Sequence, residues 1–321
     1  MKMLQRLGRV LTVLALLAIM NGSAFAQSTN QTANGFRVSP IRNEMTIEKG
    51  KSGTERITVE NPTGLPMKVR ALINDFIPSD SESGQPQLLL DGATASSHSL
   101  KKLVQSVPDF TIAANERKDV YITISIPADA AAGGYYGAVR FVPADNASQA
   151  NVNLTASVGS LFLVNVPGDI KQHLALEQIS AAVNGKTKKF ITGGDVSIVT
   201  RLKNDGDTHE KPYGKIQVKD SRGKVVANVE INNEEPRSNV LPNSIRKFET
   251  ALGKKKWFGH YTVTASLGYE PSADNDLINA KTSFWYVPLW AVIAGLVLLV
   301  AVVVAGYILV HRLQNRRSKR R

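Results

Sequence analysis

Residues 117–126 read Arg-Lys-Asp-Val-Tyr-Ile-Thr-Ile-Ser-Ile, and this stretch indicates the fold class. Valine or isoleucine stands at every even position from 120 to 126, with more polar residues between them. An apolar side chain at every second position is typical of a β-strand with one buried face. The same alternation recurs in three further segments, 56–60, 67–73 and 261–267. The sequence therefore predicts an all-β protein.

Turn residues separate the predicted strands. Segments rich in Asn, Asp, Gly and Pro lie at 61–64, 133–134, 204–207 and 220–223. Short strands joined by such turns favour an antiparallel sandwich. A chain of 321 residues is long enough for about two domains. Because Pro167-Gly168 follows a long apolar run, we predict β-sandwich domains at 36–167 and 168–284, after a linker at 27–35.

The two halves repeat the same signals in the same order. A predicted strand ends at Asn61 in the first half and at Asn204 in the second, and a turn containing a proline follows each. Further on, 114–118 is loosely echoed by 242–247. A Gly-x-Tyr then opens a strand in each half, at 134–136 and at 259–261. This shared order suggests two related sandwiches, the second more compact.

Two segments have other patterns. Ser97 to Gln105 begins with a capping serine and carries Leu100, Leu103 and Val104, so we expect a short surface helix there. Leu174 to Val183 fits a helix or a strand, and we favour a strand.

Residues 1–26 have the pattern of a secretory signal peptide. Three cations, Lys2, Arg6 and Arg9, precede the apolar run Val10–Met20, and Ala24-Phe25-Ala26 supplies small residues for cleavage before Gln27. The alternative is an uncleaved N-terminal anchor, which we disfavour because the apolar run is short for a bilayer.

The C-terminal segment predicts a transmembrane helix at 287–310. Leu289 to Val310 contains no charged residue and would span roughly 33 Å as a helix, against about 30 Å of hydrocarbon. Trp285, Tyr286 and Trp290 stand at its N-terminal edge, where aromatic rings favour the membrane interface. Six of the eleven residues at 311–321 are Lys or Arg, which predicts a cytoplasmic tail and an external body. A buried helix of a soluble protein would rarely end in so many cations.

The net charge of +12 at first suggests a nucleic-acid binder. Nine of the 39 Lys and Arg residues lie in the two terminal segments, which leaves 30 cations against 27 acids in the body. That excess is too small for a basic nucleic-acid surface, and we interpret Lys254-Lys255-Lys256 as a solvated turn. The absence of cysteine excludes disulfides and thiolate metal sites.

No catalytic, cofactor-binding or metal-ligating residue is predicted, and no cofactor is expected. The histidines lie far apart, at 98, 173, 209, 260 and 311, and no nucleophile-elbow or phosphate-loop motif occurs. An acidic group invites a calcium interpretation, but it lacks the regular spacing of a calcium loop, so a solvated loop is favoured. Its members are Asp75, Asp80, Glu82 and Asp91.

The glycine- and tyrosine-rich segment and Trp257 are interpreted as packing residues. Tyr135 and Tyr136 could stack on sugar rings, but neighbours on a strand point to opposite faces, so we favour one in the core and one facing solvent. The glycines at 133, 134 and 137 more plausibly permit tight backbone geometry than bind phosphate.

Several motifs of the first predicted domain resemble one protein family. They are Val38-Ser39-Pro40-Ile41-Arg42, Glu48-Lys49-Gly50, Thr58-Val59-Glu60-Asn61 and Ala132-Gly133-Gly134-Tyr135-Tyr136-Gly137-Ala138-Val139. These residues resemble the bacterial WxL-interacting protein family, from Phe36 to Pro167. The resemblance implies immunoglobulin-like sandwich domains, a peptidoglycan-binding first domain and no catalytic site. The second domain matches the family's usual host-binding domain only weakly.

We therefore expect a membrane-anchored bacterial cell-surface binding or adhesion protein that is not an enzyme. Its partners would be cell-wall peptidoglycan, on the resemblance alone, and other surface proteins, which can add a strand to an open sheet edge. Two alternatives stay open. One is an extracytoplasmic chaperone or scaffold for secreted subunits. The other is a cell-wall-modifying enzyme, which would need a cleft with two carboxylates about 5–10 Å apart.

Overall fold

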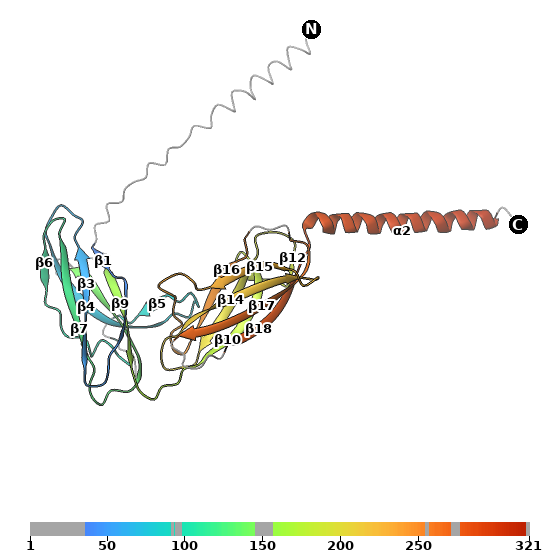
Figure 1. Cartoon of the computed structure of the whole chain (residues 1–321). Helices are drawn as coiled ribbons and strands as arrows, with labels where there is room; N and C mark the ends of the chain where they lie inside the picture. The colour runs from blue at the N-terminus through green and yellow to red at the C-terminus, as the bar shows by residue number, and fades with distance from the viewer. Residues whose placement is uncertain are drawn as a thin grey trace, which may run out of the picture. The chain divides into compact units, whose positions relative to one another are not determined.

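The described part of the chain consists of two β-sandwiches followed by one helix (Figure 1). It is a computed structural model that describes residues 36–90, 93, 98–144, 157–253, 257–270 and 277–318. The predicted signal peptide at 1–26 and linker at 27–35 lie outside the described residues, so both stay predictions. Both sandwiches and the helix belong to one compact unit, Gly35–Arg321.

The first sandwich packs a three-stranded sheet against a six-stranded one. The smaller sheet has the order β1-β3-β7, and the larger has the order β2-β9-β8-β4-β5, with β6 also paired to β4. All pairs are antiparallel except β2 with β9. The strands are β1 (Arg37–Ser39), β2 (Arg42–Thr46), β3 (Ser52–Glu60), β4 (Met67–Pro78), β5 (Pro86–Leu88), β6 (Phe110–Ile112), β7 (Arg117–Ser125), β8 (Gly133–Pro143) and β9 (Val158–Val166).

The alternation at 117–126 produces the core face of this sandwich, as predicted. Val120, Ile122 and Ile124 of β7 are buried, whereas Tyr121 between them is exposed. They pack against apolar side chains from the opposite sheet, among them Phe141 and Phe162, both fully buried. The period of two in the sequence therefore corresponds to the two faces of the strand.

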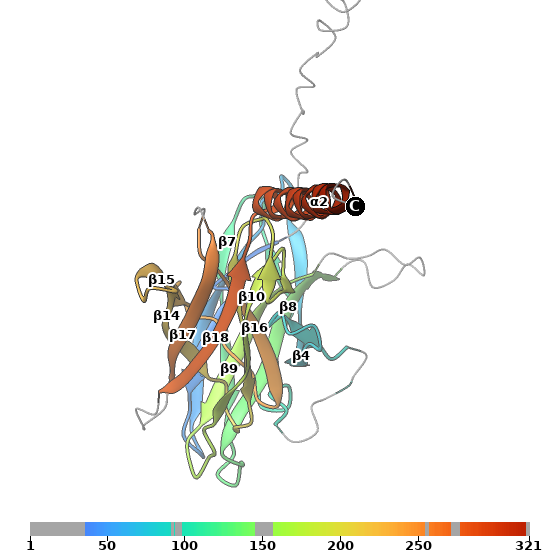
Figure 2. The same cartoon turned by 90° about the vertical axis from the view of Figure 1, so that its right-hand side faces the viewer.

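The second sandwich packs a four-stranded sheet against a five-stranded one. Their orders are β11-β10-β13-β16 and β12-β18-β17-β14-β15; Figure 2 shows β14, β17 and β18 lying side by side. Only β12 with β18 is parallel. The strands are β10 (Leu174–Val183), β11 (Lys186–Thr187), β12 (Phe190–Ile191), β13 (Ser197–Asn204), β14 (Lys211–Asp220), β15 (Val225–Ile231), β16 (Ser244–Ala251), β17 (Gly259–Glu270) and β18 (Ile278–Tyr286).

The repeat seen in the sequence has matching geometry in the two sandwiches. Asn61 and Asn204 are fully buried, and the Nδ2 atom of each donates to the carbonyl oxygen four residues on, at 2.8 and 2.7 Å. Asn115 and Asn243 both have positive φ, 57° and 55°. The two halves are therefore structurally related at these turns.

The Gly-x-Tyr motif is also repeated in the structure, but in the first sandwich it begins one residue earlier, at Gly133. Tyr135 and Tyr261 are buried, and the hydroxyl of each donates to a carbonyl oxygen just before its own strand, at 3.0 Å. The glycine two residues earlier has a positive φ in both, 128° at Gly133 and 103° at Gly259. Gly133, not Gly134, is thus the counterpart of Gly259, because the core-facing tyrosine of the first pair is Tyr135.

The helix expected at Ser97–Gln105 is wrong. Among its described residues, Leu103 and Val104 donate to the carbonyl of Leu100, which makes a single turn, and Val104 then pairs with Ile124 of β7. Burial of Leu100 in the core and this edge pairing outweigh local helix propensity. The strand favoured for Leu174–Val183 is confirmed as β10.

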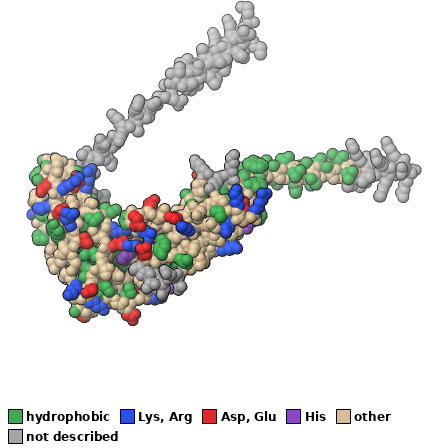
Figure 3. All heavy atoms as spheres, in the orientation of Figure 1, with side chains coloured by type: hydrophobic (Ala, Val, Ile, Leu, Met, Phe, Trp, Pro, Cys, Tyr) green, Lys and Arg blue, Asp and Glu red, His purple; other side chains and the backbone are tan. Residues whose placement is uncertain are grey.

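One helix, α2 (Leu289–Ser318), follows β18. Its segment Leu289–Leu309 is long and apolar enough to cross a membrane, and none of it is buried against the described protein. Figure 3 shows apolar side chains along its described part. The helix continues beyond the predicted limit at Val310, since no Gly or Pro follows to end it. Two immunoglobulin-like β-sandwiches before a C-terminal apolar helix confirm the predicted fold class.

Candidate functional site

An open strand edge lies where the two sandwiches meet. The backbone of β2 bonds to β9 through alternate residues, as shown by Leu161 N–H donating to Ile41 O (2.9 Å) and Ile47 N–H donating to Asn165 O (3.0 Å). The N–H and C=O groups of Glu44 and Thr46 therefore point away from β9. Among the described residues none bonds to these groups, so β2 presents an unpaired edge.

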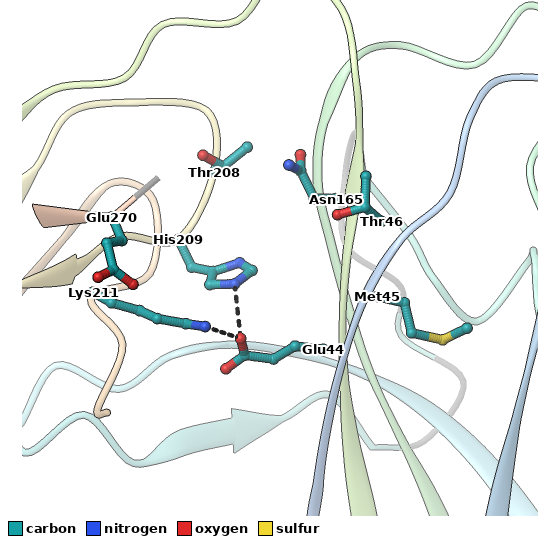
Figure 4. Close-up of a pocket in the computed structure, with 8 residues that line it drawn as sticks. All are labelled: Glu44, Met45, Thr46, Asn165, Thr208, His209, Lys211 and Glu270. Atoms are coloured by element: carbon teal, nitrogen blue, oxygen red, sulfur yellow. Dashed lines mark ion pairs between the residues drawn. The ribbon is translucent and has the colours of Figure 1, made fainter. Parts of the chain in front are cut away.

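This edge borders a pocket of about 300 Å³ (Figure 4). Residues of both sandwiches line it, and Asn165 Oδ1 in its wall is buried without a hydrogen-bond partner among the described residues. The lining consists of Glu44, Met45, Thr46 and Asn165 from the first sandwich and Thr208, His209, Lys211 and Glu270 from the second. The pocket thus combines free backbone groups with charged and polar side chains.

Glu44 is the hub of the contacts at this junction. Its carboxylate forms an ion pair with Lys211 Nζ, lies 3.3 Å from Arg42 Nε and accepts a hydrogen bond from Asn239 Nδ2 at 3.0 Å. Burial alone would raise the pKa of Glu44, but the hydrogen bonds from Lys211 and Asn239 outweigh it and the pKa is lowered. Glu44 is therefore ionised at neutral pH and links the two sandwiches.

His209 sits between Glu44 and Tyr136. Its Nε2 lies 4.0 Å from a Glu44 oxygen, and its Nδ1 lies 3.3 Å from the Tyr136 hydroxyl. Burial is the main cause that lowers the pKa of His209; Glu44 opposes it, while Lys211 and Arg42 add to it. The ring is therefore neutral at pH 7.

The neighbouring Glu210 is fully buried and has an unusual environment. Thr208 Oγ1 donates to its Oε1 at 3.4 Å, and its Oε2 has no partner among the described residues. Burial raises the pKa of Glu210 to about 8, against the weaker effect of the Thr208 hydroxyl. A protonated carboxyl is the form that this site stabilises at neutral pH.

A second set of contacts joins the sandwiches through the β4–β5 hairpin. Glu82 at its tip accepts from Arg201 on β13, with Nε to Oε2 at 2.7 Å, and its carbonyl accepts from the Lys247 N–H at 2.8 Å. A small apolar cluster also joins the sandwiches, with Phe76 and Leu163 from the first and Leu241 from the second. The junction is therefore fixed by polar bonds around a limited apolar centre.

The pocket holds two carboxylates, but both are tied in ion pairs. Glu44 is paired with Lys211, and Glu270 accepts from Arg237 Nη1 at 2.7 Å. A glycosidase needs one of its two acids protonated at working pH, and the acid with a raised pKa, Glu210, does not line the pocket. This arrangement supports binding better than acid–base chemistry.

The acidic group considered for calcium is dispersed. Buried Asp75 accepts from Ser99 Oγ and the Lys101 N–H, at 2.6 and 2.8 Å, while Glu82 binds Arg201. Asp91 lies outside the described residues. Among the described residues no group of three or more His, Asp or Glu side chains could hold a metal ion.

Tyr135, Gly137 and Trp257 serve packing, as the sequence predicts. Tyr135 packs in the core as expected, whereas Tyr136 is half-buried: its ring meets His209 edge-on, and burial raises the pKa of its hydroxyl. A Cβ at Gly137 would lie 3.0 Å from Leu100, which fits the interpretation of tight geometry. Trp257 is buried against Tyr261 and Phe284, as predicted. Lys254–Lys256 lie outside the described residues.

Sequence reasoning missed the junction residues Glu44, His209, Glu210 and Lys211. Glu44 on β2 lies more than 160 positions before the run 209–211, and only the packing of the two sandwiches brings it next to His209 and Lys211. The one local signal was the run of three titratable residues at 209–211, because charged side chains are rarely buried unless they are paired.

Comparisons with known proteins assign no family. No protein-family model and no curated protein matches the chain. Solved structures that align with it include a class 5 fimbriae chaperone, CfaA, with 16% identity over 79% of this chain and 100% of that chain (TM-score 0.39). The Escherichia coli chaperone DraB aligns at 12% identity over 77% and 98% (TM-score 0.35). A Salmonella enterica pilin–chaperone complex, SafA–SafB, aligns at 13% identity over 77% and 96% (TM-score 0.34). Each of these TM-scores is below 0.5.

Proposed function

We propose that this chain is a membrane-anchored protein of the extracytoplasmic side that holds an extended segment of another secreted or surface protein along the β2 edge. It would act as a scaffold or chaperone for that partner and not as an enzyme. The observation that carries this proposal is the unpaired edge at Glu44 and Thr46 beside the junction pocket.

Strand addition fits the groups that this edge offers. A partner strand can exchange hydrogen bonds with the free N–H and C=O of alternate residues, while pockets beside the edge select its side chains. Glu44 and Thr46 provide about four such backbone groups, worth roughly 1 kcal/mol each. That sum of about 4 kcal/mol corresponds to a millimolar dissociation constant, so backbone pairing needs support from the pocket.

Anchoring supports a weak docking site. The predicted signal peptide, the apolar segment Leu289–Leu309 and the basic tail support a single-pass anchor with the sandwiches outside. Confinement to a membrane surface raises the effective concentration of neighbours that share it. A contact of modest affinity is then sufficient to hold a partner.

The test uses a photo-cross-linking amino acid in place of Glu270, whose side chain is 56% exposed and lines the pocket. The full chain is compared on intact cells in two forms, Thr46→Pro and Thr46→Ala. Proline removes the outward N–H at Thr46, which β9 does not use, whereas alanine keeps it. Tyr121→Pro on β7 is the matched control, because Tyr121 also turns its N–H away from its partner strand β3.

We expect Thr46→Pro to abolish a protein cross-link that Thr46→Ala and Tyr121→Pro retain. Cross-linked peptides should show an extended partner segment next to β2. Equal cross-linking in all three variants would contradict docking at this edge. A product that resists protease and is released by a muramidase would replace the protein partner by peptidoglycan.

The wall contact implied by the resemblance to WxL-interacting proteins stays a separate proposal. It concerns the first sandwich alone and needs no strand addition. The full chain, detergent-solubilised, should sediment with purified peptidoglycan above the level of an unrelated sandwich protein. Absence of that sedimentation would remove the wall contact and leave the β2 proposal untouched.

A further inference from the structure

The start of α2 is bonded directly to the second sandwich. Only two residues separate the end of β18 at Tyr286 from Leu289. Three backbone bonds run from this exit to the segment after β11: Trp285 N–H to Lys189 O (2.8 Å), Val287 N–H to Ile191 O (2.8 Å) and Leu289 N–H to Thr192 O (3.1 Å). A helix that enters a bilayer at Leu289 therefore brings this end of the sandwich to the lipid surface.

Exposed aromatic side chains gather at this end. Among the described residues of the two sandwiches, the largely exposed aromatics are Tyr121, Phe190, Phe258 and Trp285, and all but Tyr121 lie beside the start of α2. Phe190 is 70% exposed and Phe258 is 62% exposed. Phe258 stacks on Trp290 of α2, with ring centroids 6.3 Å apart. Several exposed aromatic side chains gathered at one end of a domain indicate an interaction surface.

Three exposed lysines lie on the segment that leads to Phe190. Lys186, Lys188 and Lys189 precede Phe190 and are exposed, and none forms an ion pair with a described residue. Figure 3 shows Lys and Arg side chains on the second sandwich next to the start of the apolar helix. Aromatic rings with flanking lysines suit the headgroup region, where rings sit at the boundary and ammonium groups reach lipid phosphates.

We propose that Phe190, Phe258, Trp285 and Trp290, with Lys186, Lys188 and Lys189, form a membrane-binding patch. Through this patch the second sandwich contacts the bilayer surface directly and is not connected to the membrane by α2 alone. The occupant is the lipid surface that α2 enters, which is argued from the short, hydrogen-bonded exit and from the charge of the patch. This inference rests on the proposed anchor and is independent of the β2 edge.

The test measures depth with nitroxide labels on the full chain in lipid vesicles. The chain has no cysteine, so single labels can be placed at Phe190→Cys, Phe258→Cys, Trp290→Cys and, as an aqueous control, Tyr121→Cys. The ratio of oxygen to nickel-chelate collision rates reports depth. Vesicles of phosphatidylcholine alone are compared with vesicles that contain phosphatidylglycerol, with and without the double variant Lys188→Glu/Lys189→Glu.

We expect the labels at 190, 258 and 290 to report the headgroup region, and the label at 121 to report water. The double variant should shift the labels at 190 and 258 towards water in the anionic vesicles only. An interfacial label at 290 with aqueous labels at 190 and 258 would overturn the patch and keep the anchor. Aqueous labels at all positions would overturn the anchor itself. No shift in the double variant would overturn the role of the lysines.

Discussion

The two sandwiches share a buried asparagine turn but use it differently. After Asn61 the turn is Pro-Thr-Gly-Leu-Pro, which carries no charge, and Leu65 in it is 72% exposed. After Asn204 the chain continues through Asp205 and Asp207 to His209, Glu210 and Lys211, and the Asp207 carbonyl accepts from the Gly134 N–H of the first sandwich at 2.9 Å. The turn after Asn61 thus carries no charged residue, whereas the turn after Asn204 takes part in the contact between the two sandwiches.

This difference shows that one residue, the asparagine, holds the turn, and that other residues decide whether the turn contacts the other sandwich. The asparagine side chain satisfies the turn's own backbone groups in both copies, so it serves folding. Of the residues that follow Asn204, Lys211 pairs with Glu44 of the other sandwich, and His209 lies next to Glu44 and Tyr136 there. Variants that separate these two roles sharpen the comparison.

The largest effect is expected from the asparagines themselves. Asn61→Ala and Asn204→Ala should each lower the free energy of unfolding by about 2–4 kcal/mol, because each removes at least three hydrogen bonds of a fully buried amide, worth about 1 kcal/mol each. Urea unfolding of the full chain in detergent measures this loss. Hydrogen exchange should show the Gly134 amide loosened by Asn204→Ala only; loosening by Asn61→Ala would break the distinction between the copies.

The next effect is a fall in stability between pH 6.5 and 8 that Glu210 of the second sandwich produces. The pKa of Glu210 is near 8 in the folded chain and about 4.5 as a free side chain, so the folded state binds more protons and stability falls as pH rises through that window. His209, with a lowered pKa, acts in the opposite sense below about pH 6.5. Stability should therefore fall by ~2 kcal/mol between pH 6.5 and 8.

Glu210→Gln should flatten this fall, and the exposed Glu230→Gln should leave it unchanged. Chemical unfolding at a series of pH values provides the measurement. An unchanged slope in Glu210→Gln would assign the pH dependence to another group.

A smaller effect is expected from the ion pair that joins the sandwiches. Glu44→Ala should cost about 1–2 kcal/mol because it leaves Lys211 partly buried without its partner. Glu60→Ala is the matched control: the two glutamates are 23% and 24% exposed, but Glu60 pairs with Arg37 and Arg117 inside one sandwich. Small-angle X-ray scattering should show a larger radius of gyration for Glu44→Ala alone, and an equal change in both would refute the hub role of Glu44.

The smallest effect is expected at the hairpin tip. Glu82→Ala removes the pair with Arg201 and should cost about 1 kcal/mol or less, since both side chains are 29% exposed. The loss should appear as faster exchange of the Lys247 amide, whose acceptor is the Glu82 carbonyl. Unchanged exchange there would show that the backbone contact is independent of the side chain.

Sequence patterns predicted what local geometry decides. The alternation at 117–126 and the paired asparagines and tyrosines follow from strand faces and turn chemistry, and they recur in the fold. Leu100 was misassigned because its burial depends on a distant sheet. The contact between Glu44 and His209 could not be predicted from the sequence, since it requires both sandwiches to be folded and joined.

The most direct measurement compares amide hydrogen exchange at the β2 edge with that at Asp119 and Tyr121 of β7, whose N–H groups also point away from the partner strand. The full chain is studied in native membrane vesicles, with its partners, and after purification. We expect the amides of Glu44 and Thr46 to be protected in the vesicles and to exchange fast once purified, while those of Asp119 and Tyr121 exchange fast in both. Fast exchange of Glu44 and Thr46 in the native vesicles would contradict a partner strand at the β2 edge.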